Sequence, residues 1–197
     1  MFTRRTGALL LVSAVLFGGT FVAAKAGLAH LPPLLFVAVR FDIGAVVLAA
    51  FAATRLSRGE LRPRTRGDVV GIVATGAIVI GLTHALLLVG QQYVTSGVAA
   101  VVFSLNPILT PVFAAVLLSQ DGLSARGIVG MVLGLFGVAL VADPDPAALL
   151  AGGVGVPLLF AAAGTSALGA VLIRRAGATL SSTARTVGGV PLAAVLT

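Results

Sequence analysis

One apolar stretch, from Thr95 to Gln120, restricts the fold of this chain more than any other feature. It exceeds the roughly 20 residues that an α-helix needs to cross a hydrocarbon core about 30 Å thick. Its middle nevertheless carries Asn106 and Pro107, and Pro111 follows one turn later. Proline removes a backbone donor and crowds the preceding turn, so the freed carbonyl groups need partners from neighbouring helices. The stretch therefore predicts a broken, polar membrane helix that other spans surround.

The composition agrees with a membrane protein rather than a soluble one. Hydrophobic residues make up 58% of the 197 residues, charged residues only 10%, and the mean hydropathy is +1.13. Soluble domains carry about 25% charged residues. The sequence contains no cysteine, which excludes a disulfide framework and thiol catalysis. The sequence therefore predicts an all-α, polytopic helical bundle in a membrane.

Apolar runs divide the chain into six predicted spans and a shorter final run. The predicted spans are 7–29, 34–54, 69–89, 95–120, 127–142 and 154–173. The first of them is too long for the core of a signal peptide, which takes about 7–15 residues, so we interpret it as a span. The final run, Thr186 to Thr197, is too short to cross a bilayer.

Basic residues lie almost entirely on one side of these spans. With the N-terminus in the cytoplasm, the cytoplasmic segments receive all of the 13 basic residues except Lys25 and Arg40, which lie within spans. The predicted outer turns carry no basic residue, and one of them carries Asp143 and Asp145. This asymmetry predicts a cytoplasmic N-terminus. The net charge of +7 therefore reflects membrane topology, and nucleic acid is not an expected partner.

The first and sixth spans share a weak internal similarity. Aligning Lys25–Gly27 with Arg175–Gly177 also places Gly19 on Gly169. An odd number of spans separates the two segments, so the second copy would lie upside down in the bilayer. Inverted repeats of this kind are typical of secondary transporters.

Two segments carry a resemblance to a known family. In Phe17 to Phe41, FGGTFVAAKAGLAHLPPLLFVAVRF, a glycine and small polar residues precede a lysine, and a proline turn and an arginine follow. In Gln91 to Val141, QQYVTSGVAAVVFSLNPILTPVFAAVLLSQDGLSARGIVGMVLGLFGVALV, a tyrosine and small residues precede a proline-containing span and a glycine-ridged one. The chain resembles the EamA-type transporters of the drug/metabolite transporter superfamily.

The resemblance implies a fold of ten helices in two inverted five-helix repeats, with both termini in the cytoplasm. Residues 1–142 would form one complete repeat, 143–153 an external linker, and 154–197 the start of the second repeat, with span six and part of span seven. Asp121 stands where the family usually has a glutamate. The chain ends inside the expected seventh helix, and two interpretations stay open: a C-terminally truncated carrier, or one that needs a partner chain to close its pathway.

Polar residues inside the predicted spans are the candidates for substrate binding and ion coupling. An ionisable side chain in mid-helix costs about 2.5–3.5 kcal/mol on insertion scales, so such residues suggest a function. Counted along their helices, four of them lie about 20 Å from the cytoplasmic end, and Lys25 lies about 27 Å from it. A shared depth on separate helices is what a central binding site needs. The candidates are Lys25, Arg40, Asp42, His84 and Asn106.

Each candidate also has a structural interpretation. Lys25 lies near a helix end, where its ammonium group can reach outward. Arg40 and Asp42 point in different directions, so a Lys25–Asp42 or Arg40–Asp42 contact fits the sequence at least as well as substrate binding. His84 could pass protons or simply pack with a hydrogen bond, and Asn106 could bridge two helices.

Prolines and glycines suggest further roles. Pro107 and Pro111 are the candidates for a helix break or a gate. Four glycines recur at helical spacing in the fifth predicted span, and they predict close packing against another helix. They are Gly127, Gly130, Gly134 and Gly137.

The signals for enzymatic chemistry are weak. The two histidines lie far apart, and the sequence has no His-Glu-x-x-His motif, so we predict neither a metal nor a cofactor. Ser166 stands in a Gly-x-Ser pattern similar to that of intramembrane rhomboid proteases, but both histidines precede it. We predict that the chain is not an enzyme, with an intramembrane serine hydrolase that uses Ser166 as an alternative.

The function predicted from the sequence is secondary transport of small metabolites or drugs. We expect an exporter that works by alternating access, with the substrate between spans one to four and six, and with proton coupling through Asp42 or His84. Its expected partners are membrane lipid, a small-molecule substrate and a second copy of the chain in a homodimer. Its expected location is the cell membrane, as a multi-pass protein. An inactive or partner-dependent truncated carrier is a further alternative.

Overall fold

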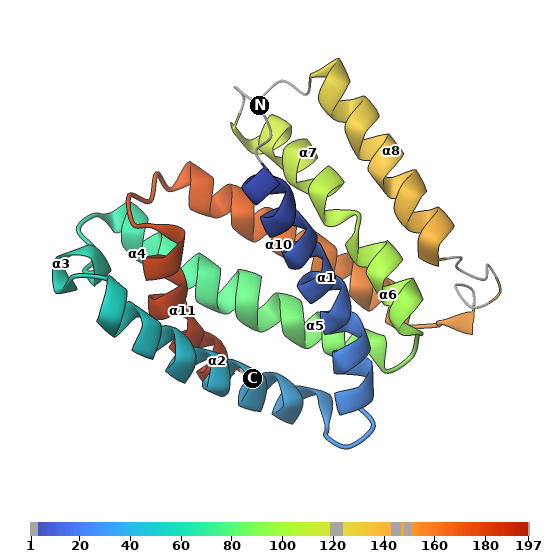
Figure 1. Cartoon of the computed structure of the whole chain (residues 1–197), viewed down its shortest axis with the longest axis horizontal. Coiled ribbons are helices and arrows are strands. Elements are labelled where there is room, and N and C mark those ends of the chain that lie inside the picture. Colours follow the sequence, from blue (N-terminus) through green and yellow to red (C-terminus); the bar gives the residue numbers. More distant parts are fainter. Residues whose placement is uncertain (1–3, 119–123, 143–146, 148–150, 197) are drawn as a thin grey trace.

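The computed structural model describes residues 4–118, 124–142, 147 and 151–196, and within these residues it contains helices and no strand (Figure 1). Five of the described helices are long and apolar enough to cross a membrane: Thr6–Gly27, Pro33–Arg55, Arg66–Gln91, Ser96–Leu118 and Gly155–Arg175. Each coincides with a predicted span. A shorter apolar segment, Ala125–Gly137, lies in the predicted fifth span. The prediction of an all-α polytopic bundle is confirmed.

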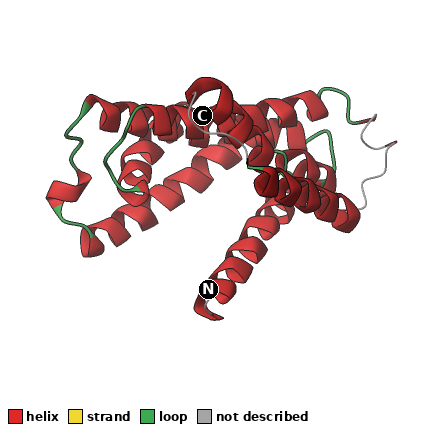
Figure 2. Cartoon of the chain, turned by 90° about the horizontal axis from the view of Figure 1, so that it is seen from above, coloured by secondary structure: helices red, strands yellow, loops and turns green. Residues whose placement is uncertain are grey.

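The first helix packs against the others only through its C-terminal part. α1 (Arg4–Gly27) buries Phe21 and Ala24, whereas Leu9 to Phe17 are exposed. Figure 2 shows that the N-terminal end of this helix projects away from the remaining helices. α2 (Pro33–Arg55) begins with Pro33. Proline is tolerated at the first position of a helix, because the backbone N–H that it lacks would have no acceptor within the helix there.

The third span contains a π-helix that the sequence analysis did not predict. It consists of α4 (Arg66–Val73), the π-helix η1 (Ala74–Leu82) and α5 (Thr83–Gln91). Gly71, Gly76 and Gly81 are five residues apart. In an α-helix this spacing would place them about 140° apart round the axis. In a π-helix, residue i bonds to residue i+5, so Gly76 and Gly81 fall on one face.

The last helix, α11 (Ser182–Leu196), uses this glycine face. It packs against η1 and α2, and a Cβ atom on Gly76 would collide with the carbonyl oxygen of Gly189. Gly81 likewise approaches Ala193. Small residues allow two helix backbones to come together in this way. This packing makes α11 an integral part of the bundle. The helix begins at Ser182, four residues before the apolar run predicted from residue 186.

The fourth span is broken, as predicted. α6 (Ser96–Phe103) ends before a short turn, and α7 (Asn106–Leu118) begins at Asn106. Pro107 is the second residue of α7, where a backbone donor is not needed, and Pro111 lies inside the helix. The hydroxyl of Ser104 donates to the carbonyl oxygen of Val101 at 2.6 Å, which satisfies one acceptor at the end of α6.

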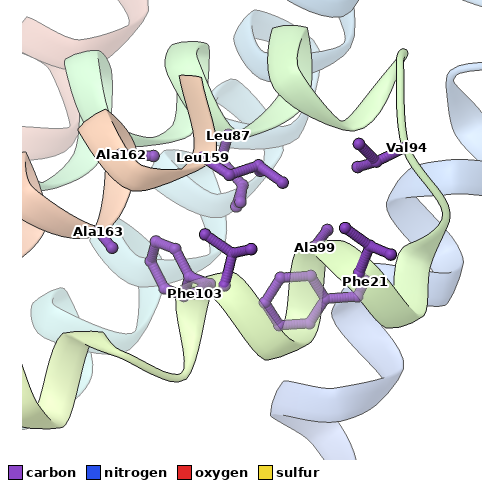
Figure 3. Packing of buried hydrophobic residues seen from close by; sticks show 10 residues of the cluster. Phe21, Leu87, Val94, Ala99, Phe103, Leu159, Ala162 and Ala163 are labelled. Atoms are coloured by element: carbon purple, nitrogen blue, oxygen red, sulfur yellow. The ribbon is translucent and has the colours of Figure 1, made fainter. Parts of the chain in front are cut away.

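The main core lies between α1, α5, α6 and α10 (Gly155–Arg175), and Figure 3 shows its side chains from close by. Phe21 and Phe103 meet edge to face with ring centroids 6.0 Å apart. Leu159, Ala162 and Ala163 of α10 are completely buried against them. α8 (Ala125–Ala142) lies outside this core and contacts α6. The short helix α3 (Arg58–Leu61) connects α2 to the third span.

A buried carboxylate joins the start of the third span to the loop between α10 and α11. Asp68 is fully buried. One carboxylate oxygen accepts hydrogen bonds from the backbone N–H groups of Thr179 at 2.7 Å and Leu180 at 2.9 Å. The other accepts from the N–H groups of Arg64 and Thr65, each at 3.0 Å. Asp68 thus holds two segments together that lie far apart in the sequence.

Candidate functional site

An open cavity of about 560 Å³ lies between α2, η1 and α11, and Val47 and Phe51 on its α2 side are exposed. Its wall is almost entirely apolar, with Gly44 and Phe51 of α2 and Ile80 of η1 among the lining residues. Arg40 is its one charged lining residue, and the only other polar one is Thr186 of α11. The Thr186 hydroxyl donates to the carbonyl oxygen of Ser182 at 2.9 Å. The sequence predicted a substrate site between spans one to four and six. This cavity is lined instead by residues of spans two and three and of α11.

Arg40 has no charged partner within the described part of the chain. Its side chain is half-buried, and its guanidinium carbon lies 5.7 Å from the centroid of the Phe41 ring. Asp42 is exposed. Arg40 and Asp42 form no ion pair, because residues two apart on a helix point to different sides. Lys25 does not pair with Asp42 either, since its ammonium group binds the carbonyl oxygens of Gln91 and Val94. The structure therefore does not contain the Asp42 contact that was one interpretation of these residues, and Arg40 lines the cavity without a charged partner among the described residues.

His84 packs behind the same aromatic ring. Its ring centroid lies 4.9 Å from that of Phe41 at an interplanar angle of 84°. Nδ1 of His84 is 2.9 Å from the carbonyl oxygen of Ile80. A carbonyl oxygen can only accept, so Nδ1 carries the hydrogen, and in the neutral ring Nε2 holds the free lone pair. The structure thus places both Arg40 and His84 against the Phe41 ring.

Asn106 bridges two helices at the break in the fourth span. Its Nδ2 donates to Oγ of Ser166 on α10 at 2.6 Å. Its Oδ1 accepts from the hydroxyl of Thr110 at 3.0 Å. A second polar bridge joins α5 to α10, with the hydroxyl oxygens of Thr83 and Thr165 at 3.1 Å. These bonds place the mid-span polar groups of α7 and α10 in contact with each other.

Lys25 binds the end of the third span rather than a carboxylate. Its Nζ donates to the carbonyl oxygens of Gln91 and Val94, each at 2.7 Å, and lies 3.4 Å from that of Gln92. The last carbonyl groups of a helix lack intrahelical partners, and a cation there also interacts favourably with the helix dipole. In return, Nε2 of Gln91 donates to the carbonyl oxygen of Phe21 at 2.7 Å. α1 and α5 are therefore joined by two reciprocal hydrogen-bonded contacts.

Sequence reasoning missed Gln91 as a structural residue. Its side chain is completely buried, whereas the adjacent Gln92 is exposed. Gln91 and Gln92 are adjacent at a predicted span boundary, and nothing in the sequence indicates which of them is buried. The carboxamide oxygen of Gln91 has no hydrogen-bond partner among the described residues.

The glycine ridge of α8 faces a groove. Among the described atoms, none lies within 4 Å of a Cβ built on Gly130, Gly134 or Gly137. Gly127 and Pro107 help to line a groove of about 420 Å³ between α7 and α8. The predicted packing role of the four glycines and the gating role of Pro107 and Pro111 stay predictions. Asp121, Asp143 and Asp145 lie outside the described residues.

Comparison with known proteins identifies the family. The model of the EamA-like transporter family matches residues 5–142. An uncharacterized transporter of Bacillus subtilis, YvbV, is 29% identical over 179 residues, which cover 90% of this chain and 56% of the relative. An uncharacterized transporter of Archaeoglobus fulgidus is 27% identical over 184 residues, covering 93% and 64% respectively. The inner membrane transporter YedA of Escherichia coli K12, also uncharacterized, is 28% identical over 130 residues, covering 64% and 40%.

No solved structure matches the chain. The chain spans less than two thirds of the length of the curated relatives it matches. The matched family consists of transporters and not enzymes, which removes the serine hydrolase alternative, and Ser166 serves as the acceptor for Asn106. The family resemblance predicted from the sequence is confirmed: this chain is a multi-pass membrane protein that belongs to the EamA-like transporter family.

Proposed function

We propose that this protein is a secondary transporter that moves small organic metabolites or drugs out of the cell by alternating access. The observation that carries the proposal is the cavity between α2, η1 and α11, into which the unpaired Arg40 reaches. An unneutralised cation deep in a span is costly, and such residues mark binding sites and pathways. Membership of a transporter family supports the same function.

The proposal includes proton coupling through His84. This side chain lies on the helix that faces α2, and its Nε2 is free to take a proton because Nδ1 is bound to Ile80. Protonation would add a second positive charge close to Arg40, since both side chains lie against the Phe41 ring. The binding of a substrate and of a proton would thereby influence each other. Asp42, the other coupling candidate, is exposed on α2.

Transport into proteoliposomes tests this function. The purified protein would be screened with a panel of labelled amino acids, nucleosides and organic acids, with and without an imposed pH gradient. We expect at least one solute to accumulate when the gradient is present. His84→Gln should lower gradient-driven accumulation at least about tenfold while solute exchange without a gradient persists.

His30→Gln is the matched control, because His30 is the only other histidine and is exposed in the turn before α2. It should transport as the wild type does. Asp42→Asn tests the second coupling candidate in the same assay. Equal gradient-driven accumulation by wild type and the Asp42→Asn, His84→Gln double variant would remove the coupling mechanism.

We also propose that the N-terminus lies in the cytoplasm. The absence of cysteine allows single-cysteine variants to report the side of each loop directly. We expect Ala29→Cys, in the turn after α1, to react with a membrane-impermeant maleimide in intact cells. Pro63→Cys, in the arginine-rich loop, should react only after permeabilisation. Both positions are exposed, and the opposite labelling pattern would reverse the topology.

The remaining parts of the proposal concern organisation and partners. We propose that residues 1–142 form one repeat and that 154–197, after the linker 143–153, begin a second repeat of inverted orientation. Membrane lipid and a small-molecule substrate are the proposed partners, and a second copy of the chain is a proposed homodimer partner. The basic loop from Arg55 to Asp68 would lie at the cytoplasmic surface.

A further inference from the structure

We propose that the cavity between α2, η1 and α11 binds an amphipathic organic anion, with the anionic group at Arg40 and the apolar part along α2 towards Phe51. The inference rests on the proposed transport function, because it names the substrate class for that site. It goes further in assigning a sign of charge, a shape and an orientation to the ligand.

The sign of the charge follows from the partners of Arg40. Within the described residues, the guanidinium group lies over the Phe41 ring and makes no hydrogen bond or ion pair. Arginine cannot lose its proton to escape the cost of burial. The nearby titratable group, His84, is neutral or positive and cannot neutralise it. A carboxylate, sulfonate or phosphate of the ligand would supply the missing charge and match the forked geometry of the guanidinium group.

The shape of the ligand follows from the rest of the wall. From Arg40 to Phe51 the lining runs along α2 for about 16 Å. Gly44, Val47 and Leu48 lie between these two ends, and Ile80 and Val190 face them from the other helices. None of these side chains can hydrogen-bond, so a polar ligand body would lose its water without compensation. An elongated apolar body of this length fits the wall.

The depth of Arg40 favours a soluble anion over a membrane lipid. Arg40 lies about 10 Å along α2 from its first residue, Pro33. The phosphate of a lipid lies at the membrane interface, outside the hydrocarbon core. A lipid would have to pull its headgroup far into the bilayer to reach Arg40. A small amphipathic anion meets no such restriction.

Radiolabelled 1-octanesulfonate is a suitable probe, because it is permanently anionic and carries an apolar chain. Binding would be measured on the purified protein in phosphatidylcholine nanodiscs. We expect saturable binding that Arg40→Gln weakens at least about tenfold, and that Arg40→Lys weakens less. Octyltrimethylammonium, with the same chain and the opposite charge, should not compete.

Two further variants separate a loss of the site from a loss of the fold. Gly44→Leu places a side chain in the cavity, and no described atom lies within 4 Å of a Cβ at this position, so the helix itself should tolerate it. It should also weaken binding. Arg55→Gln removes an exposed charge from the end of the same helix and should leave binding unchanged.

Three results would overturn the proposal. They are equal affinity of wild type and Arg40→Gln, competition by octyltrimethylammonium as strong as by unlabelled 1-octanesulfonate, and loss of probe binding when phosphatidylglycerol is added to the nanodiscs. The last result would assign the cavity to a lipid. Arg40-dependent binding without any transport would refute the proposed transport function and leave this site in place. Transport of another solute that neither octanesulfonate nor Arg40→Gln affects would support the function and refute this inference.

Discussion

Gly76→Ala should strongly destabilise the bundle, although it adds a single methyl group. The added Cβ would collide with the backbone oxygen of Gly189 on α11. A backbone atom cannot rotate away as a side chain can, so α11 must shift from η1 or the third span must distort. Overpacking of this kind costs about 3 kcal/mol. The free energy of unfolding, measured by titration with sodium dodecyl sulfate and followed by circular dichroism, would report the loss.

Gly134→Ala is the matched control on α8. No described atom lies within 4 Å of a Cβ at this position, so the same substitution should be neutral or should stabilise the helix by up to about 1 kcal/mol. Comparable losses for the two variants would show that the contact between η1 and α11 does not control stability. Destabilisation by Gly76→Ala alone would support the close contact between η1 and α11 at Gly76 and Gly189.

Asp68→Asn should cost about 3–5 kcal/mol, the range expected for breaking a buried charged network. The carboxylate accepts from four backbone N–H groups and from the Thr179 hydroxyl. An asparagine of the same size presents an NH₂ group to one pair of these donors, so two donors lose their acceptor. The loop between α10 and α11 should then become accessible to protease. Unfolding titration and limited proteolysis of this loop would check the result.

Glu60→Gln provides the control for Asp68→Asn. Glu60 occupies the same third position of a helix, in a capping arrangement with Ser57 that resembles that of Asp68 with Thr65. It is exposed, however, and has no partner outside its own turn among the described residues. We expect little change in stability. An equal effect of the two substitutions would show that capping, and not the link to the distant loop, accounts for the role of Asp68.

The spans were predictable because lipid leaves a long apolar run few alternatives to a helix. The break at Asn106 was predictable for an equally local reason, since proline cannot continue the hydrogen-bond ladder. The partner of Lys25 was not predictable in this way. Its acceptors are carbonyl groups at the end of α5, and any residue type could provide them.

Asp68 and the π-helix illustrate what a single sequence hides. Thr65 and Asp68 have the spacing of a helix cap, but nothing local indicates that Thr179 and Leu180 also bind this carboxylate. The five-residue spacing of Gly71, Gly76 and Gly81 was a signal for the π-helix. This spacing indicates a π-helix only when it is known that a second helix packs against the glycine face.

The π-helix also sets the direction in which the second half of the third span points. A π-turn is equivalent to one residue too many in an α-helix. Rewinding η1, which has nine residues, into a regular α-helix would rotate everything after it about the helix axis. His84 is the second residue after η1 and would swing away from the Phe41 ring. A twist within one helix would thus separate His84 from the Phe41 ring, with no domain moving as a rigid body.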